Sequence, residues 1–315
     1  MPQHDRLPIR RSRFDDTVTP GDTATPGDTA TPGARRRRRH FDDEPPARQR
    51  TPAPPLPDDD PIDGDRWSTW DVGQHGPTPH PDWLVTELAA VDTELGVLKT
   101  GKEADVHLVE RAVSGTSRSC VLAAKRYRTA EHRMFHRDAA YIEGRRVRRS
   151  RETRAMARRT SFGRDLLAGQ WAAAEFNALC RLWRLGAPVP YPAQLHGTEL
   201  LLEYLAEPDG QAAPRLAQLR PDPAALRMLW DQLIDALVLL TDEGLAHGDL
   251  SPFNLLVHRG RLVLIDLPQM VDIVANPQGP AFLARDIRLV SDWFTAHGLP
   301  QQATRALARV AREWH

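Results

Sequence analysis

Apolar residues recur at helical spacing in several stretches of the chain, and each stretch predicts a helix. The clearest covers residues 223–242, and its apolar positions are Leu226, Leu229, Trp230, Leu233, Ile234, Leu237 and Leu240. A second helix is expected over residues 166–185, with Gly186 as its stop. Residues 281–294 and 301–315 read as two further helices. We assign these apolar residues to a core rather than to a functional site.

Shorter apolar runs predict β-strands. Residues 255–257 and 262–265 read as two strands that turn at the dipeptide Arg259-Gly260, which predicts a hairpin. Two more strands are expected near residues 194–196 and 200–204. Helices and strands therefore both contribute to the expected fold.

The first 82 residues contain no helical or alternating apolar pattern. They carry 15 of the 27 prolines and cannot bury a core, so we expect residues 1–82 to be a disordered arm. Trp67 and Trp70 are the exceptions, and we expect them to dock on the folded part. A lead helix is predicted to follow over residues 81–95, with Pro81 in its first turn.

Composition narrows the class of protein only a little. The formal net charge is zero, and Cys120 and Cys180 are the only cysteines, so no disulfide framework is expected. No run reaches the ~18 apolar residues of a membrane span, and no apolar segment follows the N-terminal charges. We expect a protein of the reducing cytoplasm, without a membrane partner.

Polar residues suited to phosphoryl transfer lie in residues 247–254, which read His-Gly-Asp-Leu-Ser-Pro-Phe-Asn, and just after the predicted hairpin. In this chemistry one carboxylate orients the attacking hydroxyl, while an amide and a second carboxylate hold Mg²⁺. Asp249, Asn254 and Asp266 supply these groups, and the hairpin brings the last two to the same end. Taken alone, so short a pattern is equally compatible with a loop beside a capped helix.

A second part of the same chemistry lies upstream. Residues 98–109 are expected to form a strand, a turn containing Gly101, and another strand, and residues 121–125 are an apolar run that ends at Lys125. A glycine-containing turn can cover phosphates with its backbone, and a lysine on the following strand can reach the α and β phosphates. Together the two parts outline a kinase.

The lysines support this interpretation. Of the 42 basic residues only Lys99, Lys102 and Lys125 are lysines, and the other 39 are arginines. Where arginine is used so widely, a retained lysine suggests a need for a compact ammonium group. Lys99 and Lys102 could instead be solvated residues at strand ends. Lys125 ends an apolar run, where a charged side chain is rarely found unless it has a specific partner or function.

These motifs resemble the RIO-type atypical serine/threonine protein kinases, closest to the branch named for the family's first member. The resemblance covers about residues 93–294. Residues 100–106 (Thr-Gly-Lys-Glu-Ala-Asp-Val) stand in place of the longer glycine-rich loop of ordinary kinases, and residues 171–179 resemble the family's helix C. Residues 247–251 (His-Gly-Asp-Leu-Ser) replace His-Arg-Asp-Leu-Lys, and residues 265–269 (Ile-Asp-Leu-Pro-Gln) replace Asp-Phe-Gly.

The resemblance implies an α+β, two-lobed protein-kinase-like fold. Its N-lobe would span residues 83–205, with the lead helix, the phosphate loop, an arginine-rich insertion and helix C. Its helical C-lobe would span residues 206–315 and be truncated after the metal-binding Asp266.

The resemblance also implies roles for individual residues. Asp249 would be the catalytic aspartate, Lys125 the phosphate lysine and Glu175 its ion-pair partner, with Asn254 and Asp266 as ligands of Mg²⁺. Residues expected to bind ATP are Thr100, Gly101, Lys102, Glu103, Val106, Lys125, Glu203 and Leu205.

Two departures from the family pattern accompany these roles. The hinge at residues 203–205 lacks the usual glycine, which makes the adenine contacts less certain than the phosphate contacts. Gly248 stands where branch members commonly have alanine and where many regulated kinases have an arginine, so no switch by activation-loop phosphorylation is expected.

One segment of the chain is strongly basic. Residues 126–164 (Arg126 to Arg164) hold 13 arginines against four acidic residues, a net charge of +9. The resemblance places a flexible loop here, and the family's role in maturation of the small ribosomal subunit implies contact with rRNA or the subunit. The alternative is a solvated, arginine-rich helix and loop. Few aromatic residues accompany the arginines, which argues against sequence-specific RNA recognition.

The expected function is that of a RIO-like protein kinase or ATPase, which transfers the γ-phosphoryl group of Mg-ATP to a serine or threonine hydroxyl, or to water as a switch on a partner. The main alternative is a small-molecule phosphotransferase of the aminoglycoside or choline kinase type, which shares the His-Gly-Asp-x4-Asn pattern. Such enzymes need an added helical subdomain, and only 49 residues follow Asp266. The sequence identifies neither the acceptor nor the oligomeric state.

Overall fold

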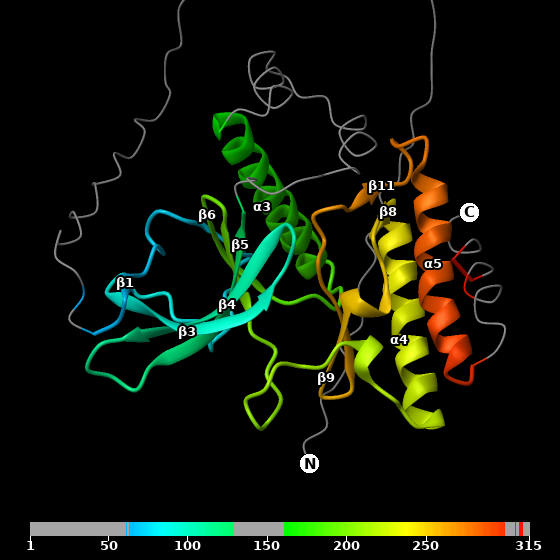
Figure 1. The fold of residues 1–315 in the computed structure, drawn as a ribbon, viewed down its shortest axis with the longest axis horizontal. Coiled ribbons are helices and arrows are strands. Elements are labelled where there is room, and N and C mark those ends of the chain that lie inside the picture. The colour runs from blue at the N-terminus through cyan, green and yellow to red at the C-terminus, as the bar shows by residue number, and fades with distance from the viewer. Residues whose placement is uncertain (1–60, 62, 129–160, 300–305, 307–308, 311–315) are drawn as a thin grey trace, which may run out of the picture. The chain divides into compact units, whose positions relative to one another are not determined.

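A seven-stranded antiparallel sheet occupies the first half of the described chain (Figure 1). The computed structural model describes residues 61, 63–128, 161–299, 306 and 309–310, which all belong to one compact unit. The strand order is β1-β3-β4-β5-β7-β6-β2. The strands are β1 (Arg66–Trp67), β2 (Gln74–His75), β3 (Ala90–Thr100), β4 (Ala104–Val113), β5 (Ser119–Tyr127), β6 (Pro192–His196) and β7 (Glu199–Glu203).

Strands β3, β4 and β5 form two consecutive hairpins. Their register fixes the positions of the residues that are predicted to bind phosphate. Val106 on β4 pairs with Lys99 on β3 and with Lys125 on β5. The glycine turn at residues 101–103 and the Lys125 side of the sheet are therefore at the same end, as the sequence predicts.

Helix α3 (Ser161–Arg184) packs against β5, β6 and β7. The helix predicted over residues 166–185 is confirmed, although α3 begins five residues earlier. Its buried residues Ala172, Phe176 and Leu179 recur at helical spacing and belong to the main apolar core. This packing brings Glu175, on the same helix, to the Lys125 strand.

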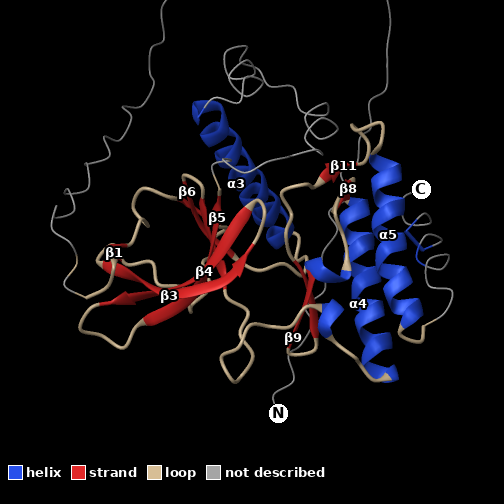
Figure 2. Ribbon diagram, viewed as in Figure 1, coloured by secondary structure: helices blue, strands red, loops and turns tan. Residues whose placement is uncertain are grey.

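The second half of the unit is helical (Figure 2). Helix α4 (Pro223–Asp242) has the predicted bounds and is capped by Asp222, whose side chain accepts hydrogen bonds from the backbone of Ala224 and Ala225. Helix α5 (Gly279–Ala296) packs on α4 through Trp230 and Phe294, whose ring centroids lie 5.1 Å apart.

Short strands and turns connect these helices. The hairpin predicted around Arg259-Gly260 is formed by β9 (Leu255–His258) and β10 (Arg261–Leu264). A second pair joins β8 (Leu245–Ala246) to β11 (Val271–Asp272). Two 3₁₀ turns, η1 (Leu216–Gln218) and η2 (Pro252–Asn254), complete the elements.

The prediction that residues 1–82 are disordered is wrong for residues 63–82. Strands β1 and β2 lie in this segment, and the side chain of Trp70 is only 7% exposed. Trp70 stacks on His75, with 3.9 Å between ring centroids, and joins the apolar cluster of the sheet. This docking of Trp70 confirms the exception predicted from the sequence, whereas the two short strands have no periodic apolar pattern that would have marked the whole segment as folded. Residues 1–60 lie outside the described residues.

The predicted lead helix over residues 81–95 is also wrong. Leu84 and Val85 are buried in an irregular segment, Leu88 is exposed, and the chain enters β3 at Ala90. Pairing of Ala90 and Val91 with β4 satisfies their backbone groups and overrides the helical pattern.

Other predictions fall largely outside the described residues. These are the helix over residues 301–315, of which residues 306, 309 and 310 are described, and most of the arginine-rich segment. No helix in the described part of the chain is long and apolar enough to cross a membrane.

Candidate active site

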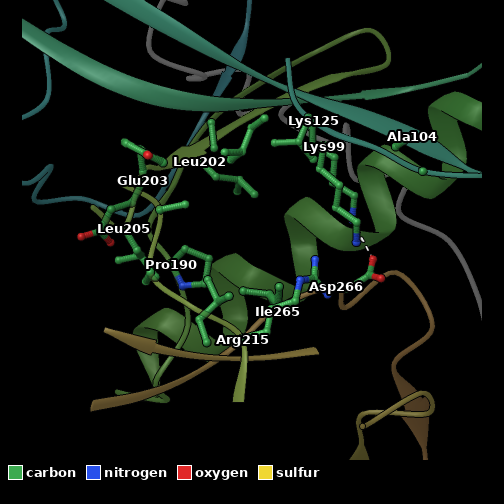
Figure 3. A pocket seen from close by; sticks show the side chains of 18 of the residues that line it. Lys99, Ala104, Lys125, Pro190, Leu202, Glu203, Leu205, Arg215, Ile265 and Asp266 are labelled. Carbon is green, nitrogen blue, oxygen red and sulfur yellow. Dashed lines mark hydrogen bonds and ion pairs between the residues drawn. The ribbon is translucent and has the colours of Figure 1, made fainter. Parts of the chain in front are cut away.

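A cavity of about 1060 Å³ lies between the sheet and the helical half (Figure 3). Val106, Ala123 and Leu202 line it from the sheet, and Leu256 and Ile265 line it from the other side. These apolar side chains form a slot suited to a flat aromatic ring such as a purine, and Lys99, Lys125 and Asp266 lie together at one end of it (Figure 3).

Lys125 is at the polar end of this cavity. Its Nζ lies 2.8 Å from a carboxylate oxygen of Glu175 and 2.7 Å from Oδ1 of Asp266. Burial lowers the pKa of Lys125, but the two carboxylates outweigh this and raise it above its ordinary value. Lys125 is therefore a fixed cation, and the predicted ion pair with Glu175 is present.

Glu175 is held from several directions. Its carboxylate is almost fully buried and accepts hydrogen bonds from the Tyr127 hydroxyl and from the backbone N–H of Leu267, the latter at 3.2 Å. Burial and the neighbouring carboxylate raise the pKa of Tyr127 well above its ordinary value, which keeps the phenol as a donor. Strand β5 thus supplies both Lys125 and Tyr127, and both side chains bond the carboxylate of Glu175.

Asp266 has an unusual backbone for a residue with a side chain. Its φ is 67°, in the left-handed region where strain is often found at functional sites. Burial raises the pKa of its carboxyl, but Lys125 outweighs this and holds the pKa below the ordinary value. The side chain remains 43% exposed and points into the cavity toward the lysine (Figure 3).

Asn254 does not line the cavity, but its backbone is hydrogen-bonded to the residue that precedes Asp266. Its Nδ2 donates to the backbone carbonyl of Asp249 at 2.9 Å, so its amide oxygen is the atom suited to bind a cation. Its own carbonyl accepts from the N–H of Ile265 at 3.1 Å, which ties it to the residue before Asp266. One carboxylate and one amide oxygen fit Mg²⁺ that is shared with phosphates. No group of three or more metal-binding side chains occurs within the described ranges.

The loop that carries Asp249 requires a glycine. Gly248 has φ +84°, and a Cβ there would lie 2.2 Å from the carbonyl oxygen of Gln269. An alanine or arginine at this position would therefore displace the turn that contains Gln269.

Helix α5 anchors the same loop. The carboxylate of Asp286, which is completely buried, accepts the N–H groups of Gly248 and Leu250 at 2.7 and 3.1 Å. Burial raises the pKa of Asp286 above its ordinary value. His247 bonds the carbonyl of Ile265 at 3.1 Å, which joins the Asp249 loop to the segment that follows β10.

The glycine turn covers the polar end of the cavity. Gly101 donates to the carbonyl of Ala104 at 3.0 Å, and a Cβ on Gly101 would approach that oxygen to 2.7 Å. Gly101, Lys102 and Glu103 line the cavity, whereas Thr100 pairs with Asp105 in the strand register and does not.

Of the predicted adenine contacts, Glu203 and Leu205 both line the cavity. The N–H of Glu203 donates to the carbonyl of Tyr191 at 2.8 Å, and its carboxylate accepts the N–H of Tyr191 at 3.0 Å. The hinge is thus fixed without the usual glycine.

Several polar residues at the site are outside the set that was predicted to bind ATP or to act in catalysis. Lys99 and Arg215 line the cavity, and burial and mutual repulsion lower the pKa of Lys99. Arg285 contacts Asp249 at 3.0 Å. The scarcity of lysine had marked Lys99, but nothing distinguished Arg215 or Arg285 among 39 arginines.

The fold and this site define a class. A β-sheet lobe whose Lys125 on β5 pairs with Glu175 on α3 faces Asp249 and Asp266 across one cavity, and this is the α+β arrangement of the protein-kinase-like phosphotransferases. Residues 111–307, more than half of the chain, match the family model described as the RIO domain. The chain therefore belongs to the RIO family, which confirms the resemblance seen in its motifs.

Individual relatives agree with this assignment. The chain is 32% identical over 216 residues to the serine/threonine-protein kinase RIO1 of Caenorhabditis elegans, covering 68% of this chain and 40% of that protein. It is 31% identical over 210 residues to the RIO-type serine/threonine-protein kinase Rio1 of Haloferax volcanii, covering 66% and 65%. The match thus spans less than two thirds of either relative.

A solved structure, the Rio2 kinase-ADP/Mg2+-phosphoaspartate complex from Chaetomium thermophilum, matches with 20% identity and a TM-score of 0.47, covering 70% of this chain and 69% of that one.

Proposed function

We propose that the chain is an atypical protein kinase or ATPase that transfers the γ-phosphoryl group of Mg-ATP to a serine or threonine hydroxyl, or to water. The observation that carries this proposal is the meeting of Lys125, Glu175, Asp249 and Asp266 at one cavity. The names of the relatives, which are serine/threonine-protein kinases, support it.

Binding of ATP would begin in the apolar slot. The adenine would lie between Val106 and Ala123 on one side and Leu256 and Ile265 on the other, against the hinge. The phosphates would then extend under the glycine turn toward Lys125. Lys125 now contacts Asp266 directly, and a phosphate oxygen would replace that carboxylate as its partner while Glu175 keeps it in place.

Asp249 would orient the acceptor hydroxyl or water for in-line attack. Mg²⁺, held by Asp266 and Asn254, would supply charge neutralisation on the phosphates. The chain itself contributes positioning and fixed charges rather than a covalent step, which is the usual source of acceleration in phosphoryl transfer.

Incubation with γ-labelled ATP tests this function. We expect label in protein or in free phosphate, and its loss in the Asp249→Asn variant. Transfer to an aminoglycoside, to choline or to another small acceptor, with no label in protein or free phosphate, would favour the small-molecule phosphotransferase instead.

We further propose that the arginine-rich segment binds a polyanion such as rRNA. Its net charge of +9 supports this, since phosphate contacts supply most non-specific affinity for nucleic acid. Arg126 already pairs with Glu94 and Glu199, and Arg128 pairs with Asp105, so we expect both to contribute less than unpaired arginines would. Any such binding would depend mainly on arginines further along the segment.

A further inference from the structure

We propose that Arg285 on helix α5 is a positioning residue for the catalytic aspartate. This inference rests on the proposed function, because it assigns Arg285 a task in the same phosphoryl transfer. The guanidinium would hold the Asp249 carboxylate in the orientation that receives the acceptor hydroxyl.

Two hydrogen bonds from one nitrogen make this contact. Nη2 of Arg285 donates to Oδ1 of Asp249 and to the carbonyl oxygen of Gly248, each at 3.0 Å. The side chains of Arg285 and Asp249 are 31% and 34% exposed, so the pair is partly shielded from solvent. The contact links the carboxylate to the backbone that precedes it, which restricts rotation about the Asp249 side chain. The Phe282 ring, 5.8 Å from the guanidinium carbon, contacts the arginine from the preceding turn of the helix.

The neighbouring Asp286 separates this task from anchoring of the loop. Asp286 accepts the N–H groups of Gly248 and Leu250 and so fixes the backbone on both sides of Asp249. Arg285 reaches the side chain instead. Loss of Arg285 should therefore leave the loop in place and remove one contact that orients the carboxylate. A misplacement of about 1 Å in a catalytic group can cost about 100-fold in rate, so this freedom matters for turnover.

The alternative is an inhibitory contact, in which the guanidinium occupies an oxygen that the acceptor needs. The two readings predict opposite effects of removing Arg285. A positioning residue lowers kcat when it is removed, and an inhibitory residue raises it.

The test compares Arg285→Gln and Arg285→Lys with Arg288→Gln in the full chain. Arg288 is an exposed arginine three positions along the same helix, which makes it a matched control for loss of charge. We expect Arg285→Gln to lower kcat for ATP turnover about tenfold, with KM for ATP within about twofold of the parent, because the arginine contacts Asp249 rather than the nucleotide. Lysine should restore part of the rate, and Arg288→Gln should match the parent.

A double variant removes the remaining ambiguity. If Arg285 acts through Asp249, Arg285→Gln should have no further effect in the Asp249→Asn background. An equal fall in both backgrounds, an unchanged kcat or a raised kcat would each overturn the inference. A parent that turns over no ATP would overturn the proposed function and this inference together, whereas a normal parent with an equally active Arg285→Gln variant overturns this inference alone.

Discussion

Lys125 is the residue around which the charges of the cavity are arranged. It lies between two carboxylates, and only one of them, Glu175, is buried by the fold. Asp266 is partly exposed to the cavity and is therefore the partner that a bound nucleotide could replace. Because of this difference in burial, we expect the Lys125–Glu175 contact to persist and the Lys125–Asp266 contact to be exchanged when a nucleotide binds.

The two aspartates should respond differently to removal of charge. Asp249→Asn is expected to lower turnover at least tenfold with little change in ATP affinity, because it removes orientation of the acceptor but no phosphate contact. Asp266→Asn should weaken Mg-ATP binding itself. Equilibrium binding of a fluorescent ATP analogue with Mg²⁺, together with turnover, checks both, and equal losses of affinity would contradict the assigned roles.

Tyr127 should matter through Glu175. Removal of its hydroxyl in Tyr127→Phe leaves a buried carboxylate oxygen without that donor, at a cost of about 1.5–3 kcal/mol. We expect a lower melting temperature and a several-fold rise in KM for ATP, as Glu175 holds Lys125 less firmly. An unchanged KM with a lowered melting temperature would show that Tyr127 has only a structural role.

At the level of elements, charged side chains hold strand β1 and cross-link other strands of the sheet. Arg66 on β1 bonds Glu199 on β7 at 2.6 Å, and Arg126 bonds the same carboxylate at 2.6 Å. Arg111, fully buried, bonds both carboxylate oxygens of Asp92 and the side chain of Gln194. This network joins strands that are distant in the sequence.

The Arg66 contact predicts a pH dependence. Burial raises the pKa of Glu199, but the two arginines outweigh it and lower the pKa below its ordinary value of 4.5. This stabilisation is present above the ordinary value and is lost as the pH falls through the lowered pKa. Arg66→Met should therefore cost about 1 kcal/mol near pH 7, or ~3 °C in melting temperature, and progressively less in acid. Thermal melts of both proteins across pH check this, and a constant difference would contradict it.

Two truncations locate the start of the folded unit. Deletion of residues 1–60 should leave the melting temperature and turnover unchanged, because that sequence lacks the apolar residues for a core. Deletion of residues 1–75 removes Arg66, Trp70 and β2 and should lower the melting temperature by several degrees. Equal stability of both truncated proteins would show that the β1–β2 segment contributes little.

For the whole molecule, the zero net charge conceals a segregated distribution. The +9 segment is balanced by acidic residues elsewhere in the chain, so the formal charge says little about partners. A polyanion near residues 126–164 would encounter the excess positive charge of this segment and not the average charge of the chain.

The expected behaviour is affinity without sequence preference. Binding of structured RNA should fall linearly in log–log form as salt rises. Replacing Arg145, Arg146, Arg148 and Arg149 with serine should weaken binding and reduce the slope, with ATP hydrolysis near normal. Filter binding across a salt series measures this. Absence of RNA binding at low salt, or equal slopes for the parent and the variant, would contradict the nucleic-acid proposal.

The sequence by itself determined the local elements and the order of the catalytic groups. Helix α4, the β9–β10 hairpin and the Lys125 strand are where periodicity and turn residues predicted them, because these signals act over a few neighbouring residues. The motifs around Asp249 and Asp266 were recognisable for the same reason, since their spacing is short and their residue types are unusual.

Only the tertiary structure decided which distant residues meet. Docking of Trp70 on the sheet, the start of β3 at Ala90, and the contacts of Arg215 and Arg285 with the site depend on pairing and packing across the chain. A single tryptophan without periodic neighbours, or one arginine among 39, carries no local signal of its partner. Arg285 and Asp249 are 36 residues apart in the sequence, and the packing of helix α5 against the catalytic loop brings them to 3.0 Å.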